Sequence, residues 1–185
     1  MMTSVTAAAD RLAKLNDGLL AACKYVLITI VGVLALILMA AVFWRYALNN
    51  ALPWSEEISK YMMVWLTFLG APIALRHASH ISIDLLLKIF PPRGQQAFHL
   101  VINLIIIVTM GIVFWKGIGF AQLGARQVAS SINVSMLYMY VAVPVGAALT
   151  CLVAIEHALR SLAGIADPDA GLHVDEEAFA DEIRE

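Results

Sequence analysis

Four of the histidines have the spacing that would let them serve redox chemistry in a membrane. A membrane haem is held by histidines that face each other from neighbouring helices. The four fall at the same end of three predicted helices: His77, His80, His99 and His157. However, the first two lie outside the predicted hydrocarbon region, and the first apolar run contains no histidine. We therefore favour interfacial histidines that bond headgroups, water or helix-end carbonyls, and we expect no catalytic residue, cofactor or metal site.

Paired carboxylates stand at the start of another apolar run, in the stretch LPWSEEISKYMMVW, residues 52–65. Ser55 is the predicted N-cap, with Asn49 and Asn50 as rival caps. A cap at Ser55 places Glu56 and Glu57 in the first helical turn, where negative charge complements the helix dipole. Pairing of either glutamate with Arg45 is a further possibility. Two interpretations stay open: the acids stabilise a helix start, or one of them contacts a partner protein.

Other catalytic and ion-coupling patterns are missing from the sequence. There is no Walker loop, nucleophile elbow or HExxH motif. No Asp, Glu, Lys or Arg lies deep within an apolar run, whereas ion pathways through membranes usually carry such groups. Cys23 and Cys151 have no CxxC spacing, so we predict small core residues. We expect a chain that neither catalyses nor couples ions by itself.

The composition indicates that the helices lie in a lipid bilayer. The 185 residues are 61% hydrophobic with a mean hydropathy of +0.81, above the level of globular chains. The net charge of −2 argues against a nucleic-acid partner. Four runs are long enough to cross about 30 Å of hydrocarbon: about 25–44, 58–75, 97–115 and 134–155. We predict an all-α integral membrane protein with four transmembrane helices and a short interfacial amphipathic helix at about 81–90.

The distribution of basic residues predicts the orientation. Eight Lys and Arg fall on the side of both termini and of the connection after the second span, against four on the other side. The excess predicts cytoplasmic termini. The predicted organisation is a cytoplasmic segment 1–23, a membrane domain 24–160 and a tail 161–185 that is strongly acidic.

Small residues and prolines mark positions of expected close packing or bending. Gly70 and Ala74 are four apart in the second span, as are Gly146 and Thr150 in the fourth. This spacing lets helix backbones approach one another, inside the bundle or against a partner. Interior prolines at positions 72 and 144 predict kinks, which membrane helices tolerate.

Residues 45–86, RYALNNALPWSEEISKYMMVWLTFLGAPIALRHASHISIDLL, resemble the small membrane subunit of tripartite ATP-independent periplasmic (TRAP) transporters. The matching features are an Arg that closes span one, a Trp-Ser-x-Glu elbow, a Trp-Leu-x-Phe-Leu-Gly core and a basic turn with His. In this chain they are Arg45, Trp54, Ser55, Glu56, Glu57, Trp65, Gly70, Arg76 and His80. The resemblance implies that these residues form a structural motif or a partner interface.

The resemblance also implies a three-part importer in the bacterial inner membrane. A periplasmic binding protein delivers an organic acid, a large many-span subunit moves it by a Na⁺-coupled elevator motion, and the small subunit enlarges the fixed scaffold. Two alternatives remain at this stage. One is a haem-bearing membrane anchor of a quinone-linked respiratory enzyme; the other is an independent channel or small exporter.

Overall fold

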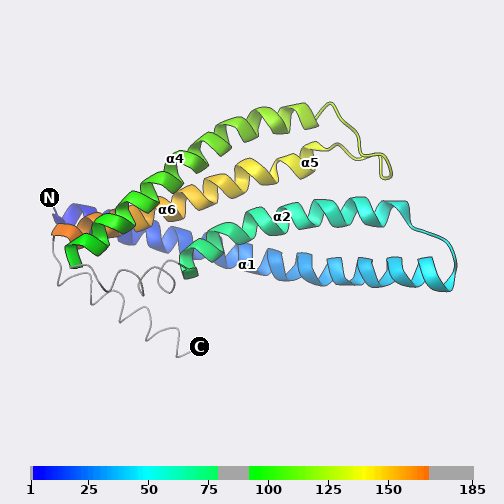
Figure 1. Ribbon diagram of the computed structural model, residues 1–185, viewed down its shortest axis with the longest axis horizontal. Coiled ribbons are helices and arrows are strands. Elements are labelled where there is room, and N and C mark those ends of the chain that lie inside the picture. The colour runs from blue at the N-terminus through cyan, green and yellow to red at the C-terminus, as the bar shows by residue number, and fades with distance from the viewer. Residues whose placement is uncertain (1, 79–91, 167–185) are drawn as a thin grey trace.

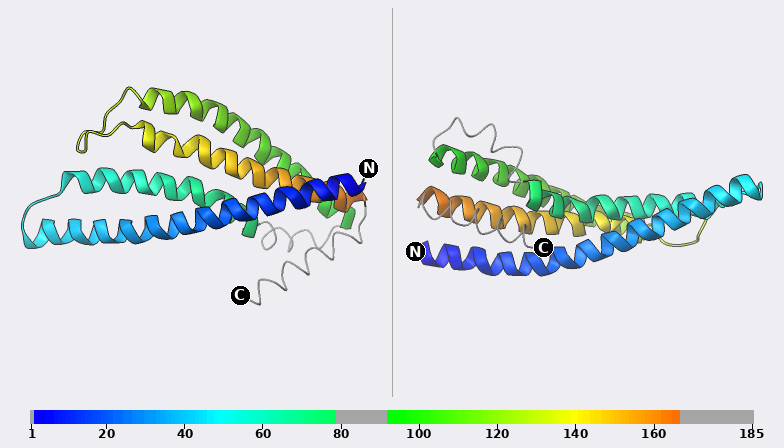
Figure 2. Two further views of the ribbon diagram at one scale, coloured as in Figure 1. Left: turned by 180° about the vertical axis from the view of Figure 1, so that it is seen from behind. Right: turned by 90° about the horizontal axis from the view of Figure 1, so that it is seen from below.

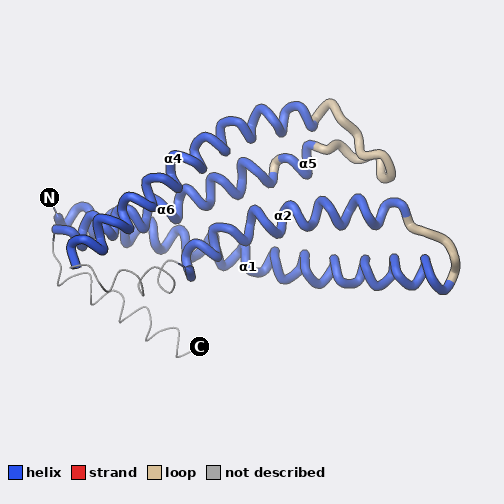
Figure 3. Tube along the Cα trace, viewed as in Figure 1, coloured by secondary structure: helices blue, strands red, loops and turns tan. Residues whose placement is uncertain are grey.

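The computed structural model describes residues 2–78 and 92–166, and these residues form helices joined by short loops (Figure 3). The helices are α1 (Met2–Ala47), α2 (Pro53–Ala78), α4 (Pro92–Gly124), α5 (Leu137–Tyr140) and α6 (Ala142–Ala166). Four stretches are long and apolar enough to cross a membrane: Ala9–Ala47, Pro53–His77, Gly94–Gly124 and Leu137–Ala163. The predicted all-α fold with four spans is confirmed. The predicted interfacial helix at 81–90, His80 and the tail beyond Ala166 lie outside the described residues.

The helices form two hairpins that meet at one end of the molecule and separate toward the other (Figure 1). One hairpin is α1 with α2, and the second is α4 with α5 and α6. The loops that close the two hairpins lie at the same end, which we call the elbow end (Figure 3). At the opposite end, the network end, α6 lies between α4 and α1 (Figure 2). The central helix α6 therefore contacts the other three long helices.

Helix α1 is one continuous element, so the predicted segment 1–23 and the predicted span 25–44 lie on a single helix. Its 46 residues measure about 69 Å at 1.5 Å per residue, roughly twice a bilayer core. Its first half buries one face through residues spaced by four and three: Ala9, Ala13, Asn16 and Leu20. In its second half, by contrast, large apolar side chains such as Tyr25, Leu36 and Met39 are exposed. Only the first half of α1 is thus a core element of the bundle.

The start of α2 differs from the prediction. The helix begins at Pro53, so Ser55 lies inside the first turn and its hydroxyl donates to the carbonyl of Leu52 at 2.7 Å. The prediction of Ser55 as N-cap is wrong. Proline at the first helical position is favoured because its fixed φ suits a helix and its missing N–H would have no helical partner there. Glu56 still lies in the first turn, as predicted.

The two interior prolines have different consequences. Pro72 is fully buried and lies within a continuous α2. Pro144 lies in the first turn of α6, directly after the break at Val141 that separates α5 from α6. A proline ring crowds the carbonyl four residues earlier, here that of Tyr140 at the end of α5. The fourth span therefore lacks a helical bond to the Tyr140 carbonyl from position 144, while Val141 keeps helical dihedrals and Val145 N–H bonds the Val141 carbonyl at 3.2 Å.

The predicted small-residue contacts are formed at one of the two sites. A methyl group on Gly146 would lie 2.6 Å from Cβ and 2.8 Å from the carbonyl carbon of Phe68, so α6 and α2 approach to backbone contact there. The hydroxyl of Thr150, one turn on, donates to the Gly146 carbonyl at 2.8 Å. Gly70 has nothing within 4 Å of such a methyl group. Its surface is left open within this chain.

Candidate functional site

At the elbow end, an ion pair joins the end of α1 to the start of α2. Arg45 Nη2 lies 2.8 Å from Glu56 Oε1. Both side chains are more than half exposed, and exposed pairs of this kind contribute roughly 0–1 kcal/mol. The sequence left open which glutamate would pair with Arg45, and the structure assigns Glu56.

The neighbouring residue Glu57 bonds the loop between α4 and α5, whereas Glu56 pairs with Arg45. Its two carboxylate oxygens accept the backbone N–H groups of Ser130, at 3.0 Å, and Ser131, at 2.7 Å. The tip of this loop is a tight turn, closed by a bond from the Ala129 N–H to the Val134 carbonyl at 2.8 Å. Charge-assisted bonds to two adjacent amides hold the turn against the other hairpin. Glu57 therefore ties the hairpins together across the open end of the bundle.

Trp65 makes a second connection between the hairpins. Its indole N–H donates to the backbone carbonyl of Tyr138 at 2.9 Å, which satisfies a carbonyl in the short helix α5. Trp54, at the start of α2, is 38% exposed. Trp65 thus bonds within this chain, whereas the ring of Trp54 is partly exposed.

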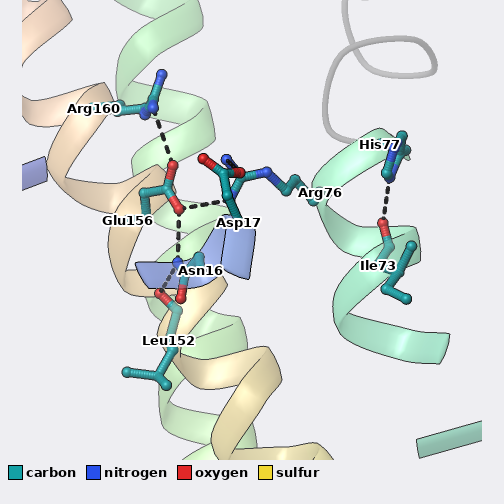
Figure 4. A network of polar contacts seen from close by, with 8 residues as sticks. All are labelled: Asn16, Asp17, Ile73, Arg76, His77, Leu152, Glu156 and Arg160. Atoms are coloured by element: carbon teal, nitrogen blue, oxygen red, sulfur yellow. Dashed lines mark hydrogen bonds and ion pairs between the residues drawn. The ribbon is translucent and has the colours of Figure 1, made fainter. Parts of the chain in front are cut away.

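At the network end, Glu156 of α6 is buried and joins three helices (Figure 4). Its Oε2 accepts from Asn16 Nδ2 of α1 at 2.7 Å and from Arg76 Nη1 of α2 at 2.9 Å. Its Oε1 lies 3.1 Å from Arg160 Nη2, one turn further along α6. The side chain is 2% exposed, so the carboxylate depends on these partners in place of water.

The network extends toward the surface through Arg76. Its second terminal nitrogen lies 2.6 Å from Asp17 Oδ1 of α1 (Figure 4). The guanidinium thus bridges one buried and one largely exposed carboxylate, a geometry that its planar fork of donors permits. We call Asn16, Asp17, Arg76, Glu156 and Arg160 the inner network.

The sequence pointed to only one member of the inner network, Arg76. Glu156 falls one residue beyond the predicted fourth span, where an acid ordinarily faces water. The sequence signal was the i,i+4 spacing of Glu156 and Arg160, which is equally typical of an exposed helix pair. Its decisive partners come from helices 80 and 140 residues away along the chain.

Two bonds that involve histidines lie within single helices. Nδ1 of His77 lies 2.8 Å from the carbonyl of Ile73. The backbone carbonyl of His99 accepts from Asn103 Nδ2 at 2.9 Å, a bond within α4. The helix–helix contact predicted for these two residues stays a prediction. In residues 2–78 and 92–166, no three His, Cys, Asp or Glu side chains converge as a metal site would require.

Four spanning helices, apolar outer faces and polar ties at both ends define a multi-pass helical membrane protein. Residues 34–164 match the family described as tripartite ATP-independent periplasmic transporters, DctQ component. The chain belongs to this family. The transporter interpretation of the sequence is thereby supported, and the haem-anchor alternative is not.

Individual relatives agree with the family. The chain is 30% identical over 87 residues, 47% of its length, to a Haemophilus influenzae protein that carries the name TRAP transporter small permease protein. It is 26% identical over 113 residues, 59% of its length, to the sialic acid TRAP transporter small permease protein SiaQ of Vibrio cholerae. The matched parts cover 54% and 65% of those two proteins, about half to two thirds of their length. A C4-dicarboxylate small permease protein, DctQ of Vibrio cholerae, is 28% identical over 78 residues, 42% of this chain and 34% of that protein.

Proposed function

We propose that this chain is the small scaffold subunit of a TRAP transporter that imports an organic acid across the bacterial inner membrane. In this proposal the chain binds a large elevator-type membrane subunit, which carries the substrate and Na⁺ sites, and a periplasmic binding protein docks on the complex. Both termini lie in the cytoplasm, in line with the excess of basic residues on that side.

The observation that carries the proposal is the exposed second half of α1. The most apolar window of this helix has none of its residues buried inside the chain. This window packs along α2 on one side only, so most of its apolar surface is left uncovered by this chain. A fixed partner surface would supply the missing contacts, as a scaffold role requires.

A second surface suited to the large subunit lies on α2. The exposed positions along one face are Met63, Thr67, Ala71 and Ala74, with Gly70 beside them. Three of the five are Gly or Ala, and small residues let helix backbones approach closely in a membrane. We propose this face, together with the exposed ring of Trp54, as part of the interface with the large subunit.

The proposal is tested by co-expression of the chain with the large many-span subunit of the proposed transporter. We expect the two to copurify. We expect Na⁺-driven uptake of an organic acid only in proteoliposomes that contain both. Uptake by this chain alone, or full uptake by the large subunit without it, would contradict the scaffold role.

Glu57 offers a sharper test, because its bonds order the loop that faces away from the network end. We predict that Glu57→Ala leaves the unfolding midpoint of the chain nearly unchanged. Amide exchange at Ser130 and Ser131 should accelerate, and affinity for the large subunit should weaken by about five- to tenfold. Hydrogen exchange and a copurification titration measure the two effects.

The matched control is Glu56→Ala, which removes a carboxylate one position away without touching the loop. Its exchange profile at Ser130 and Ser131 should equal that of the unmodified chain. If amide exchange at Ser130 and Ser131 in the Glu57 variant equalled that of the unmodified chain, Glu57 would act only as a helix-end charge.

A further inference from the structure

A cavity of about 190 Å³ lies between α1 and α2 at the network end. It has a charged and an apolar part. Its lining residues are Asp17, Leu20, Ala21, Lys24, Ile73, Arg76 and His77. Three of them are apolar and four carry charged or titratable side chains, so the cavity matches an amphipathic ligand better than a purely apolar or purely ionic one.

The charged groups of the cavity follow one another along α1. Lys24 immediately precedes the charge-free run that enters the hydrocarbon. Asp17 lies seven residues earlier, on the same face of α1 and about 10 Å further from that run. Arg76 reaches between the helices from α2 and pairs with Asp17 at 2.6 Å. From the hydrocarbon outward, the order is therefore a cation, then an Arg–Asp pair.

His77 adds an acceptor to the rim of the cavity. Its Nδ1 lies 2.8 Å from the Ile73 carbonyl, and a carbonyl can only accept, so Nδ1 carries the hydrogen. In the neutral ring this leaves Nε2 as the acceptor. The cavity then offers donors from Lys24 and Arg76, and acceptors from Asp17 and His77.

We propose that this cavity binds the headgroup of a glycerophospholipid that carries a primary ammonium, of the phosphatidylethanolamine class. The phosphodiester lies against Lys24 and Arg76, and the ammonium lies against Asp17 and His77. In such a lipid the phosphate is nearer the hydrocarbon than the ammonium is, which is the order of charges along α1. Basic pockets between membrane helices at the headgroup level are suited to lipid phosphates.

A membrane lipid, as opposed to a free phosphate ester, fits because exposed apolar residues follow the cavity along α1. Beyond Lys24 along α1, Tyr25 is 72% and Ile28 is 60% exposed. Acyl chains extending from a headgroup at Lys24 would cover this first part of the exposed half of α1, and the large subunit of the proposed function would cover the remainder. Arg76 would then connect the bound lipid to the inner network.

The test is a lipid titration of the delipidated full-length chain, followed by native mass spectrometry. The probes are phosphatidylethanolamine, phosphatidylglycerol, phosphatidylcholine and soluble glycerophosphoethanolamine. We expect phosphatidylethanolamine to bind most tightly, and Lys24→Gln to weaken it about tenfold. The control Lys14→Gln removes the same charge from an exposed position of α1 outside the cavity and should leave binding unchanged.

Each contrary result overturns a defined part of the proposal. Equal losses in the two lysine variants would remove the cavity as the site. Equal or tighter binding of phosphatidylglycerol would overturn the role of Asp17 and His77 as ammonium acceptors. If glycerophosphoethanolamine bound as tightly as the intact lipid, the acyl chains would not contribute, and the ligand would not have to be a membrane lipid. Asp17→Asn gives an independent check, since it should reduce the preference for phosphatidylethanolamine over phosphatidylglycerol.

Discussion

Replacement of Glu156 by alanine is expected to lower the free energy of unfolding of this chain by about 3–5 kcal/mol, the usual loss when one member of a buried ion pair is removed. The carboxylate is 2% exposed and accepts bonds from Asn16, Arg76 and Arg160. Without it, these donors lose their common acceptor at the junction of three helices. Arg76 keeps Asp17, whereas the described structure gives Arg160 no second acid.

The measurement is equilibrium unfolding in mixed micelles, followed by circular dichroism. Glu56→Ala is the matched control, because it breaks an ion pair of similar length whose members are both more than half exposed. Its cost should stay below about 1 kcal/mol. Glu156→Gln should fall between the two, since it keeps the side-chain volume and loses the charge. An alanine variant as stable as the Glu56 control would show that the inner network contributes nothing to stability.

The spans were predictable because the bilayer imposes a strict rule. Backbone polar groups in hydrocarbon must bond within their own helix. An uncharged run of about twenty residues in a membrane therefore forms a spanning α-helix. The same rule does not apply to residues before Lys24. Those residues form no charge-free run, so the sequence alone did not show that α1 would begin before them. Ala9, Ala13 and Asn16 are buried on one face of α1, and Asn16 bonds Glu156 of α6. The spacing of that face is helical, but the residue that Asn16 bonds lies 140 residues away along the chain.

The partners of the motif residues were not predictable for a related reason. Glu57 and its two amide donors are more than 70 residues apart, and the donors are backbone groups that any sequence would supply. The indole of Trp65 likewise bonds a backbone carbonyl. The sequence therefore pointed to side chains that make bonds between the hairpins, but the topology of the chain determined what they bind.

Contacts at three separate places hold the two hairpins together. They leave much of the outer surface of the bundle uncovered. The inner network closes one end of the molecule, and Glu57 with Trp65 ties the hairpins at the other. Between these ends, α2 and α6 touch at Gly146. Three separated ties of different chemistry would hold two diverging hairpins in one geometry, as a static scaffold needs.

The central tie gives the second large expected effect: Gly146→Ala should destabilise the chain by about 1–3 kcal/mol, the range for overpacking a close contact. The added methyl would lie 2.6 Å from Cβ and 2.8 Å from the carbonyl carbon of Phe68. Because part of the obstacle is backbone, no rotamer change relieves it, and α2 must move away from α6. Gly111→Ala is the control, since nothing lies within 4 Å of a methyl there. It also measures the gain in helix propensity of up to about 1 kcal/mol that alanine brings over glycine.

The two glycine variants are compared by unfolding in mixed micelles and by the distance between spin labels on α2 and α6. We expect the Gly146 variant to be less stable and its labels to lie further apart, and the Gly111 variant to match or exceed the parent. The same displacement would shift the proposed partner face of α2, so the Gly146 variant should also lose affinity for the large subunit. If both variants unfolded alike with unchanged label distances, the contact at Gly146 would not set the spacing of the hairpins, and the rigidity of the bundle would rest on its two ends alone.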